Sequence, residues 1–373
     1  MSVLRTFSVP RLIAALSLLL AHSLHAATLH VCMSGCAFST IQSAIDYATS
    51  GDLISIATGR YVENIAIIGK RLTLAGDSTA GVTEVAAAAR GPVIVLGSGT
   101  DEGYEEVDIQ NLTISGGTHL TGTGVGGGIQ VRRGAFLHLL NSIITHNIAA
   151  FGGGIGVNTP AGPATTIIGC LVDDNTSPSQ GPLGGGGIVV VQGSTVLLQQ
   201  STVTRNQALN GGGIYTDAGT HATIDRTTIS DNSVSQVHAH LGFVGGTGAG
   251  LSISSDVSIT NSTIADNTAR GEELAFGGGL FVVLDGGRQT LTSTVIAHNS
   301  ATAPAEAGDG GGIFVAAPDS HDTLTLNKVY VIENQASAGA AGGISNEGTL
   351  LLSGTLIRDN TGFNCKGGAG CPP

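Results

Sequence analysis

The segment VTRNQALNGGGI, residues 203–214, contains the two signals whose repetition decides the fold. Val203 stands three positions before Asn206, and the glycine run 211–213 leads into the aliphatic Ile214. An aliphatic residue after a glycine-rich segment recurs eight times, at intervals of 26 to 37 residues: Ile129, Ile155, Ile188, Ile214, Leu251, Leu280, Ile313 and Ile344. This spacing is typical of solenoids, in which each repeat forms one coil stacked on the next.

The asparagine signal recurs in the same eight repeats, as Asn147, Asn175, Asn206, Asn232, Asn267, Asn299, Asn334 and Asn360. A β-branched aliphatic residue stands three positions before each of them: Ile144, Val172, Val203, Ile229, Ile264, Ile296, Val331 and Ile357. Such residues favour strands. Two positions further upstream lies a mainly hydroxyl-bearing column: Ser142, Cys170, Ser201, Thr227, Ser262, Thr294, Val329 and Thr355. Because strand side chains alternate between faces, we expect both columns to point inward.

The repeated asparagine also has a physical role. Asparagine tolerates a left-handed backbone, and its amide can bond neighbouring backbone groups. We therefore expect it to occupy the left-handed corner of each coil and to hydrogen-bond to its counterparts above and below. The glycines should allow a close approach of the backbone at another corner.

These columns predict an all-β solenoid. Short strands upstream, such as residues 53–56 and 107–114, extend the eight repeats to about 10–11 rungs. The open ends of a solenoid need covers. Residues 39–50 show helical spacing with Ser39 as N-cap, which predicts a short N-terminal capping helix, and residues 361–373 are the predicted C-terminal cap. We expect one domain over about residues 28–373, with the repeat body at about 107–360.

The opening segment STIQSAI (39–45), followed by Gly51-Asp52 and GRYVEN (59–64), resembles the start of pectate-lyase-like and pectin-esterase-like proteins. The body resembles the repeats of bacterial polymorphic outer membrane proteins, with Gly usually in place of their Ala and Ile or Val in place of their Phe. Over roughly residues 38–360, the resemblance implies a single right-handed parallel β-helix. It does not extend to a C-terminal translocator barrel, because the chain ends at Pro373 directly after the last repeat.

The resemblance does not bring catalytic motifs with it. The Asn-Thr-Asp and Gly-His-Gly sequences of polygalacturonase-like hydrolases do not occur in the chain, nor does an Arg-x-Pro-x-x-Arg segment of the pectate-lyase type. The match Gly59-x-Tyr61-x-Glu63 to pectin esterases lacks the catalytic segments that should follow it, so we expect it to be structural. Many unrelated functions share this scaffold.

Charge and the N-terminal segment bear on location. The formal net charge is -12, which argues against nucleic acid as a partner. Arg5 and Arg11 precede the apolar run 12–20 and small residues at 26–27, which predicts a Sec-type signal peptide over residues 1–26; an uncleaved anchor is the alternative. No later segment reaches 18 apolar residues, so we expect no transmembrane segment after cleavage. The protein should be secreted, periplasmic or associated with the outer membrane.

Export permits disulfides. Two cysteine pairs lie close in sequence, one near each end, and we expect each to form a local bond: Cys32 with Cys36 and Cys365 with Cys371. A zinc site at the first pair is the weaker interpretation, because no His or Cys cluster accompanies it. Cys170 occupies the hydroxyl-bearing column and should be a buried, inert thiol.

The residue before each ladder asparagine is always polar or ionisable: His146, Asp174, Arg205, Asp231, Asp266, His298, Glu333 and Asp359. Burying eight such groups would be costly, so this column should face solvent. Asp231 and Asp266 would lie about 5 Å apart, one rung from each other, and are candidates to bind Ca²⁺ or to act on a substrate. Asp174, beside Asp173, is a weaker candidate for paired-carboxylate hydrolysis. No other cofactor is expected.

A second acidic segment over residues 101–108 predicts an exposed loop before a strand, with cation binding as the alternative: Asp101, Glu102, Glu105, Glu106 and Asp108. The insertions between repeats gather on one side. The segment from each asparagine to the next aliphatic residue varies in length from 8 to 19 residues, whereas the segment from that aliphatic residue to the next asparagine varies only from 16 to 21. The predicted ligand-contacting residues of these loops are His238, His240, Phe243, Glu272, Glu273 and Asp309. A metal site at the His-x-His sequence 238–240 would need a further ligand.

The leading functional hypothesis is an exported, non-catalytic binding or adhesion module for a polysaccharide or cell-surface glycan. The missing catalytic motifs favour it over enzymatic function. The alternative is a polysaccharide lyase or glycoside hydrolase that acts on an acidic polysaccharide along the loop-decorated side.

Overall fold

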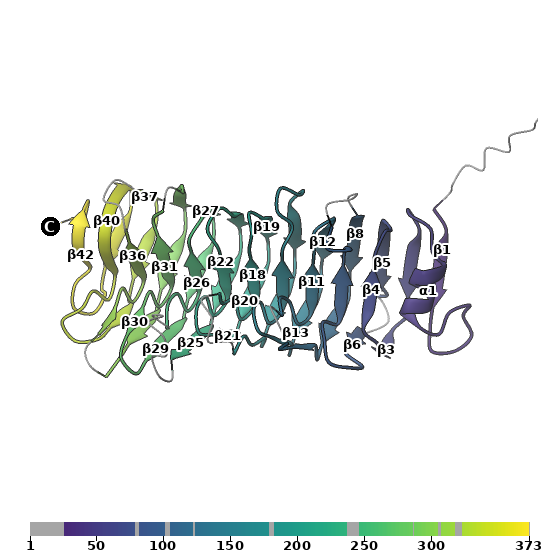
Figure 1. The fold of residues 1–373 in the computed structure, drawn as a ribbon. Coiled ribbons are helices and arrows are strands. Elements are labelled where there is room, and N and C mark those ends of the chain that lie inside the picture. The colour runs from purple at the N-terminus through teal and green to yellow at the C-terminus, as the bar shows by residue number, and fades with distance from the viewer. Residues whose placement is uncertain are drawn as a thin grey trace, which may run out of the picture.

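The chain winds into one long coil whose axis runs from the purple N-terminal end to the yellow C-terminal end in Figure 1. The computed structural model describes residues 26–78, 82–100, 105–121, 124–178, 183–236, 246–285, 287–304, 307–317 and 323–372. The predicted signal peptide therefore lies almost entirely outside the described residues. Strands from successive coils stack side by side and pair in parallel. We describe them as three columns of strands and one set of short strands.

Column 1 contains the longest strands. It comprises β1 (Thr28–Val31), β2 (Leu53–Ile56), β5 (Leu72–Gly76), β8 (Glu105–Gln110), β12 (Ala135–Leu140), β16 (Thr165–Ile168), β19 (Thr195–Gln199), β23 (His221–Asp225), β27 (Asp256–Thr260), β32 (Gln289–Thr292), β37 (Thr323–Asn327) and the second half of β40 (Ile344–Ser353).

Column 2 begins at the aliphatic residue after each glycine-rich segment. It comprises β4 (Ile65–Ile67), β7 (Ile94–Leu96), β11 (Ile129–Val131), β15 (Ile155–Val157), β18 (Ile188–Val190), β22 (Ile214–Thr216), β26 (Leu251–Ile253), β31 (Leu280–Val283), β36 (Ile313–Ala316), the first half of β40, and β42 (Cys365–Ala369).

Column 3 carries the β-branched residues that precede the asparagines. Its eleven strands are β3 (Gly59–Val62), β6 (Thr83–Ala86), β9 (Thr113–Ser115), β13 (Ile143–Thr145), β17 (Leu171–Asp173), β20 (Thr202–Thr204), β24 (Thr228–Ser230), β28 (Thr263–Ala265), β33 (Val295–Ala297), β38 (Tyr330–Ile332) and β41 (Leu356–Arg358). Eleven stacked strands within the described residues agree with the predicted number of rungs.

Short strands follow column 3 and complete the coil. They are β10 (Thr118–His119), β14 (Ile148–Ala149), β21 (Gln207–Ala208), β25 (Ser233–Gln236), β29 (Thr268–Gly271), β30 (Ala275–Phe276), β34 (Ser300–Thr302), β35 (Gly308–Asp309) and β39 (Gln335–Ala336). Small side chains, including Ala269, Ala275 and Ala301, form a separate cluster beneath them. Each rung thus runs from column 2 through columns 1 and 3 to the short strands.

The corner after column 3 is made differently from our expectation. The left-handed residue is the one before each ladder asparagine, from His146 at φ 54° to Asp359 at φ 58°. The prediction that asparagine occupies this position is therefore wrong. The left-handed conformation costs about 1–2 kcal/mol for a residue with a Cβ. It turns the side chain of the left-handed residue outward, whereas the side chain of the asparagine that follows points inward. All eight members of this outward column are exposed.

The asparagines form a continuous buried ladder. Asn206 Nδ2 donates to Asn232 Oδ1 at 3.0 Å and to the Val172 carbonyl at 2.9 Å. The same Asn232 oxygen also accepts from the Asn206 backbone N–H. Equivalent bonds connect the amides from Asn147 to Asn360. Each amide thus satisfies backbone groups that the corner would otherwise leave unpaired.

The glycine before column 2 packs directly on this ladder. A Cβ on Gly187 would stand 2.7 Å from the Gly213 carbonyl oxygen and 3.0 Å from Asn206 Nδ2. Glycine is required here because a side chain would push the opposite corners of the coil apart. The hydroxyl-bearing column forms a second ladder beside it, in which Ser201 Oγ accepts from Cys170 N–H. Cys170 itself is buried and forms no disulfide, and burial raises the pKa of its thiol to about 11.

The N-terminal end is covered by α1 (Ile41–Tyr47), which buries Ile41, Ala44 and Ile45 against the first coils. The N-cap is Thr40, one residue later than predicted, because its hydroxyl is the one that accepts from the Ser43 N–H. Glu63 accepts from the N–H groups of Ile41 and Gln42 at 2.8 and 3.0 Å. This contact gives the Gly59-x-Tyr61-x-Glu63 segment the structural role we expected.

Disulfides join Cys32 to Cys36 and Cys365 to Cys371, one near each end of the coil. At the C-terminal end β42 continues column 2 but covers only part of β40. Leu351, Leu356 and Phe363 are consequently exposed there.

Candidate functional site

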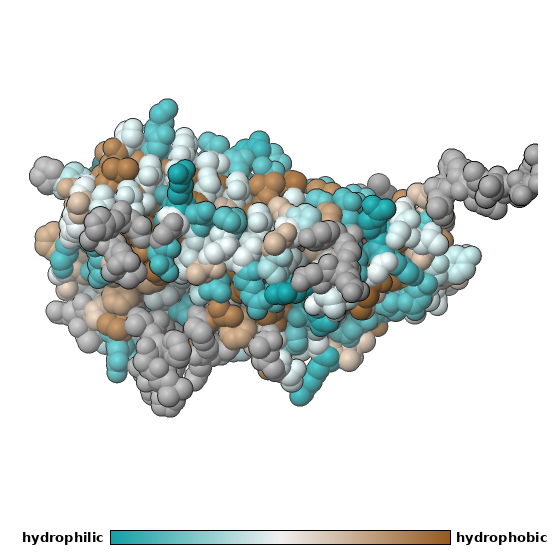
Figure 2. Space-filling model, turned by 45° about the horizontal axis from the view of Figure 1, so that its top comes forward, coloured by the Kyte–Doolittle hydropathy of each residue, from teal (hydrophilic) through white to brown (hydrophobic). Residues whose placement is uncertain are grey.

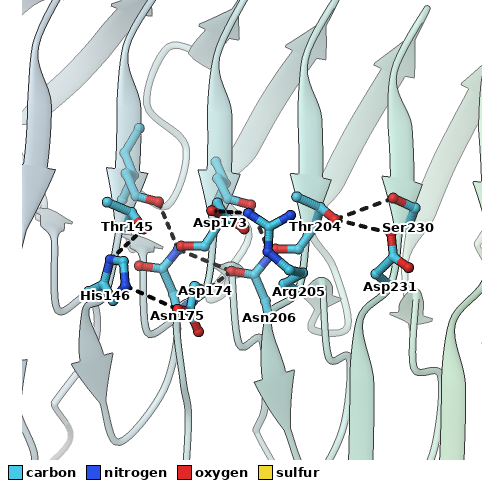
Figure 3. Close-up of polar contacts among 12 residues, drawn as sticks. Thr145, His146, Asp173, Asp174, Asn175, Thr204, Arg205, Asn206, Ser230 and Asp231 are labelled. Atoms are coloured by element: carbon cyan, nitrogen blue, oxygen red, sulfur yellow. Dashed lines mark hydrogen bonds and ion pairs between the residues drawn. The ribbon is translucent and has the colours of Figure 1, made fainter.

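The exposed corner column carries the first group of predicted site residues, and Figure 3 shows part of it. Asp174 lies beside the preceding rung, where His146 Nε2 approaches its Oδ2 at 3.1 Å. Asp173, on the outer side of β17, is mostly buried and pairs with Arg205 at 2.5 Å. The two carboxylates therefore belong to different ion pairs, and this arrangement does not present them together as an acid and a base for one substrate.

Asp231 and Asp266 occupy equivalent corner positions on adjacent rungs, since the Asp231 N–H donates to the Ala265 carbonyl. Both are exposed. Asp231 Oδ2 also accepts from Thr204 Oγ1 at 3.5 Å. The calcium site at these two residues stays a prediction.

The loop-side candidates are only partly described. His238, His240 and Phe243 lie outside the described residues. Glu272 and Glu273 are exposed beside β29. Asp309 has a structural task, because it accepts from the Ala341 N–H at 2.8 Å and from Ser345 Oγ at 3.0 Å, both in the next coil.

The sequence analysis did not identify the surface formed by the outward side chains of column 1, which we call the outer face. Four hydroxyl residues stand in register on consecutive strands: Thr223, Ser258, Thr290 and Thr325. We call them the hydroxyl row. A second row lies two residues along each strand and consists of Asp225, Thr260, Thr292 and Asn327. Because rungs repeat about every 4.8 Å, the two rows present donors and acceptors at regular intervals along the axis.

The electrostatics of the second row are set by its own hydrogen bonds. Thr260 Oγ1 and Asn261 Nδ2 donate to Asp225 Oδ1 at 2.8 and 3.0 Å. The Asn261 and Thr260 bonds lower the pKa of Asp225, so this carboxylate remains charged.

A groove of about 340 Å³ crosses the hydroxyl row. Its lining includes Thr223, Ser258 and Thr290, with His221, Asp256 and Arg288 at one side. His221 Nδ1 lies 3.2 Å from Asp256 Oδ2, and the Arg288 backbone N–H donates to the other carboxylate oxygen. The groove therefore combines hydroxyl groups with a histidine–carboxylate pair and an arginine residue.

A second groove, of about 250 Å³, lies on the same face nearer the N-terminal end. Arg71, Thr73, Glu106 and Asp108 are part of its lining. His138, the register partner of Asp108, stands beside it on β12. Among the described residues, Glu106, Asp108 and His138 form the one group of three potential metal ligands whose atoms all lie within 4.8 Å of one another.

This group also corrects the interpretation of the acidic segment. Glu105, Glu106 and Asp108 belong to strand β8 rather than to a loop, and the strand ends at Gln110 because the next residue, Asn111, is left-handed at φ 57°. Period-2 alternation over residues 105–110 was the available signal, since Glu106 and Asp108 alternate with the buried Val107 and Ile109. Glu105 points inward, and burial raises the pKa of its carboxyl group.

Apolar groups are scattered on the surface. In Figure 2, hydrophobic side chains form several separate patches among hydrophilic ones. An aromatic group occurs on the outer side of column 2, where Phe314 lies 4.5 Å from the Phe276 ring centre and 5.6 Å from that of Phe281. Within the part of the chain that the structure describes, no helix has the length and apolar character needed to cross a membrane.

A family model described as a right handed beta helix region matches residues 93–244, roughly two fifths of the chain. Together with the stacked parallel sheets, this match shows a right-handed parallel β-helix fold. A search among curated proteins found no match. The fold and the two disulfides are compatible with an extracellular protein.

Proposed function

We propose that this protein is an exported, non-catalytic binding module that holds an extended glycan along its outer face. The observation that carries the proposal is the hydroxyl row, whose four members stand in register and three of which, Thr223, Ser258 and Thr290, line one groove. A flat, regular array of donors and acceptors suits a polymer with a regular repeat, because each sugar hydroxyl can meet an equivalent protein group on the next rung.

The carboxylates near this face support binding over catalysis. Glycoside hydrolysis needs two carboxyl groups that face the same bond. Beside the hydroxyl row, Asp256 is paired with His221, and Asp225 with Thr260 and Asn261. A polysaccharide lyase or hydrolase remains the second candidate, and the loop side is its predicted location.

The test compares two sets of in-register threonines. The first variant is Thr223→Val/Thr290→Val/Thr325→Val on the outer face. The control is Thr202→Val/Thr228→Val/Thr263→Val, which removes three in-register outward hydroxyls from column 3. Valine keeps the shape and the strand preference of threonine while it removes the hydrogen bonds. Co-sedimentation with a panel of neutral and acidic polysaccharides measures the affinity.

The outer-face variant should lose at least about tenfold in affinity, since each hydrogen bond contributes about 0.5–1.5 kcal/mol. The control should bind like the parent. Equal loss in both variants would contradict the location, and release of unsaturated or reducing sugars from the bound polymer would contradict the non-catalytic assignment.

A further inference from the structure

We propose that Glu106, Asp108 and His138 form a binding site for a divalent transition-metal ion, with Zn²⁺ as the reference. The ligand atoms come from neighbouring positions of two paired strands. Glu106 and Asp108 are two residues apart on β8, so both point outward, and His138 is the register partner of Asp108 on β12. The His138 Nε2 to Glu106 Oε1 distance is 3.4 Å.

The donor set fits this class of ion. One imidazole nitrogen and two carboxylate oxygens are ligands that zinc and its neighbours accept, and three protein ligands leave further positions for water. A calcium site would instead use oxygen ligands alone, in greater number. Here all three ligand atoms lie within 4.8 Å of one another, so small side-chain rotations bring them onto one ion.

Two groups outside the set orient the ligands. Thr166 Oγ1, on the next strand of column 1, lies 2.6 Å from His138 Nδ1. When the threonine oxygen accepts a hydrogen bond from Nδ1–H, the proton stays on Nδ1. Nε2 then keeps its lone pair and faces Glu106, as a metal-binding histidine requires. On the other side, Thr73 Oγ1 donates to Asp108 Oδ2 at 3.3 Å. Such outer contacts fix ligand orientation in metal sites.

The location leaves room for the ion and its water. The 250 Å³ groove opens beside Glu106 and Asp108, and the two strands that carry the ligands have six register pairs between them. A rigid sheet holds the ligand backbone in place, so little ordering is needed on binding.

The chain supplies its own matched control. His221 and Asp256 form a similar pair on the same face, at 3.2 Å, but they provide only one imidazole and one carboxylate. Two ligands are too few for a tight site. The histidine–acid pair His298 with Glu333 likewise provides only one imidazole and one carboxylate.

The experiment titrates untagged protein with Co²⁺ and then displaces it with Zn²⁺. The visible absorption of Co²⁺ reports coordination, and elemental analysis after gel filtration gives the zinc content per chain. Because the His-x-His sequence at 238–240 offers two further imidazoles, all proteins carry His238→Ala/His240→Ala as a common background. Variants are His138→Ala, Asp108→Asn, Thr166→Val and the control His221→Ala.

We expect one ion per chain in the background protein and in His221→Ala. His138→Ala and Asp108→Asn should abolish stoichiometric binding, and Thr166→Val should weaken it by about tenfold or more while Zn²⁺ still binds. Zn²⁺ should raise the unfolding temperature of the background protein and leave that of His138→Ala unchanged. Absence of binding at millimolar Co²⁺ and Zn²⁺, or retained stoichiometry in His138→Ala, would overturn the site. Neither result bears on polysaccharide binding by the hydroxyl row.

Discussion

The first coils, before residue 120, and the later coils close by different chemistry. In the first coils, single side chains hold the corners. Asp52 accepts from the N–H groups of Ala27 and Thr49, and the half-buried Asn64 spans the backbone of the following turn. In the later coils, one continuous column of buried amides does the same work from Asn147 to Asn360.

The difference shows how a repeat changes the consequence of losing one residue. The Asn64 side chain connects its own turn to the following one only, and its half-exposed atoms can bond to water instead. A ladder amide serves its own rung and both neighbours, in a place that water does not reach. Stability should therefore be more sensitive to single changes in the later coils than in the first ones.

The largest expected effect is that of Asn206→Ala. The change removes the Asn206 amide and leaves Asn175 and the Val172 carbonyl without their partners. Since each buried unsatisfied group costs about 1–3 kcal/mol, we expect a loss of about 3–5 kcal/mol in unfolding free energy. Urea denaturation measures it, with Asn64→Ala as the control at about 1 kcal/mol. Equal losses of unfolding free energy in Asn206→Ala and Asn64→Ala would show that a ladder position is no more sensitive to substitution than a single side chain of the first coils.

Gly187→Ala should have the next largest effect, about 2 kcal/mol, because the added methyl group overlaps the ladder and a backbone carbonyl. Gly219→Ala is the control that tests backbone conformation without steric crowding of the added methyl group. Gly219 is left-handed at φ 73° with open space around it, so its substitution should cost only about 1 kcal/mol. Thermal unfolding of both variants provides the comparison. A smaller loss for Gly187→Ala than for Gly219→Ala would contradict close packing as the reason for glycine.

Acid should weaken the first coils and spare the amide ladder. The backbone hydrogen bond from Thr49, helped by that from Ala27, lowers the pKa of Asp52. A carboxyl group with a lowered folded-state pKa stabilises the protein above its unfolded-state pKa of about 3.8, and this contribution disappears as the pH falls through the lowered value. Asp52→Asn should therefore cost about 1 kcal/mol at pH 7 and progressively less below about pH 4. Urea midpoints of both proteins at several pH values test this, and a pH-independent difference would contradict it.

The interior could be predicted because its signals repeat. Val203 and Asn206 recur with their counterparts in eight aligned repeats, so one strand face and one ladder follow from spacing alone. The left-handed residue was misplaced by one position, because the column before the asparagines mixes Arg205 and Glu333 with Asp and His, whereas the next position is always asparagine. Asn111 is left-handed as well and ends strand β8 at Gln110, where a continuous strand over 107–114 was expected.

The outer face was harder to foresee, because its residues meet only through stacking. Asp108 and His138 are 30 positions apart, and Thr223 and Thr325 belong to strands three rungs apart in column 1. Rung length varies from one repeat to the next, so contacts between neighbouring rungs depend on the register of each pair of strands.

The amino-acid sequence was sufficient for the coil, the inward columns, the asparagine ladder and the two ends with their cysteine pairs. These features arise from alternation within a strand and from a motif repeated once per rung, both of which are local. The grooves, the hydroxyl row and the grouping of Glu106, Asp108 and His138 exist only after the rungs are stacked. Parallel pairing brings residues about 4.8 Å apart that the chain separates by a whole turn, and that register is a property of the folded molecule.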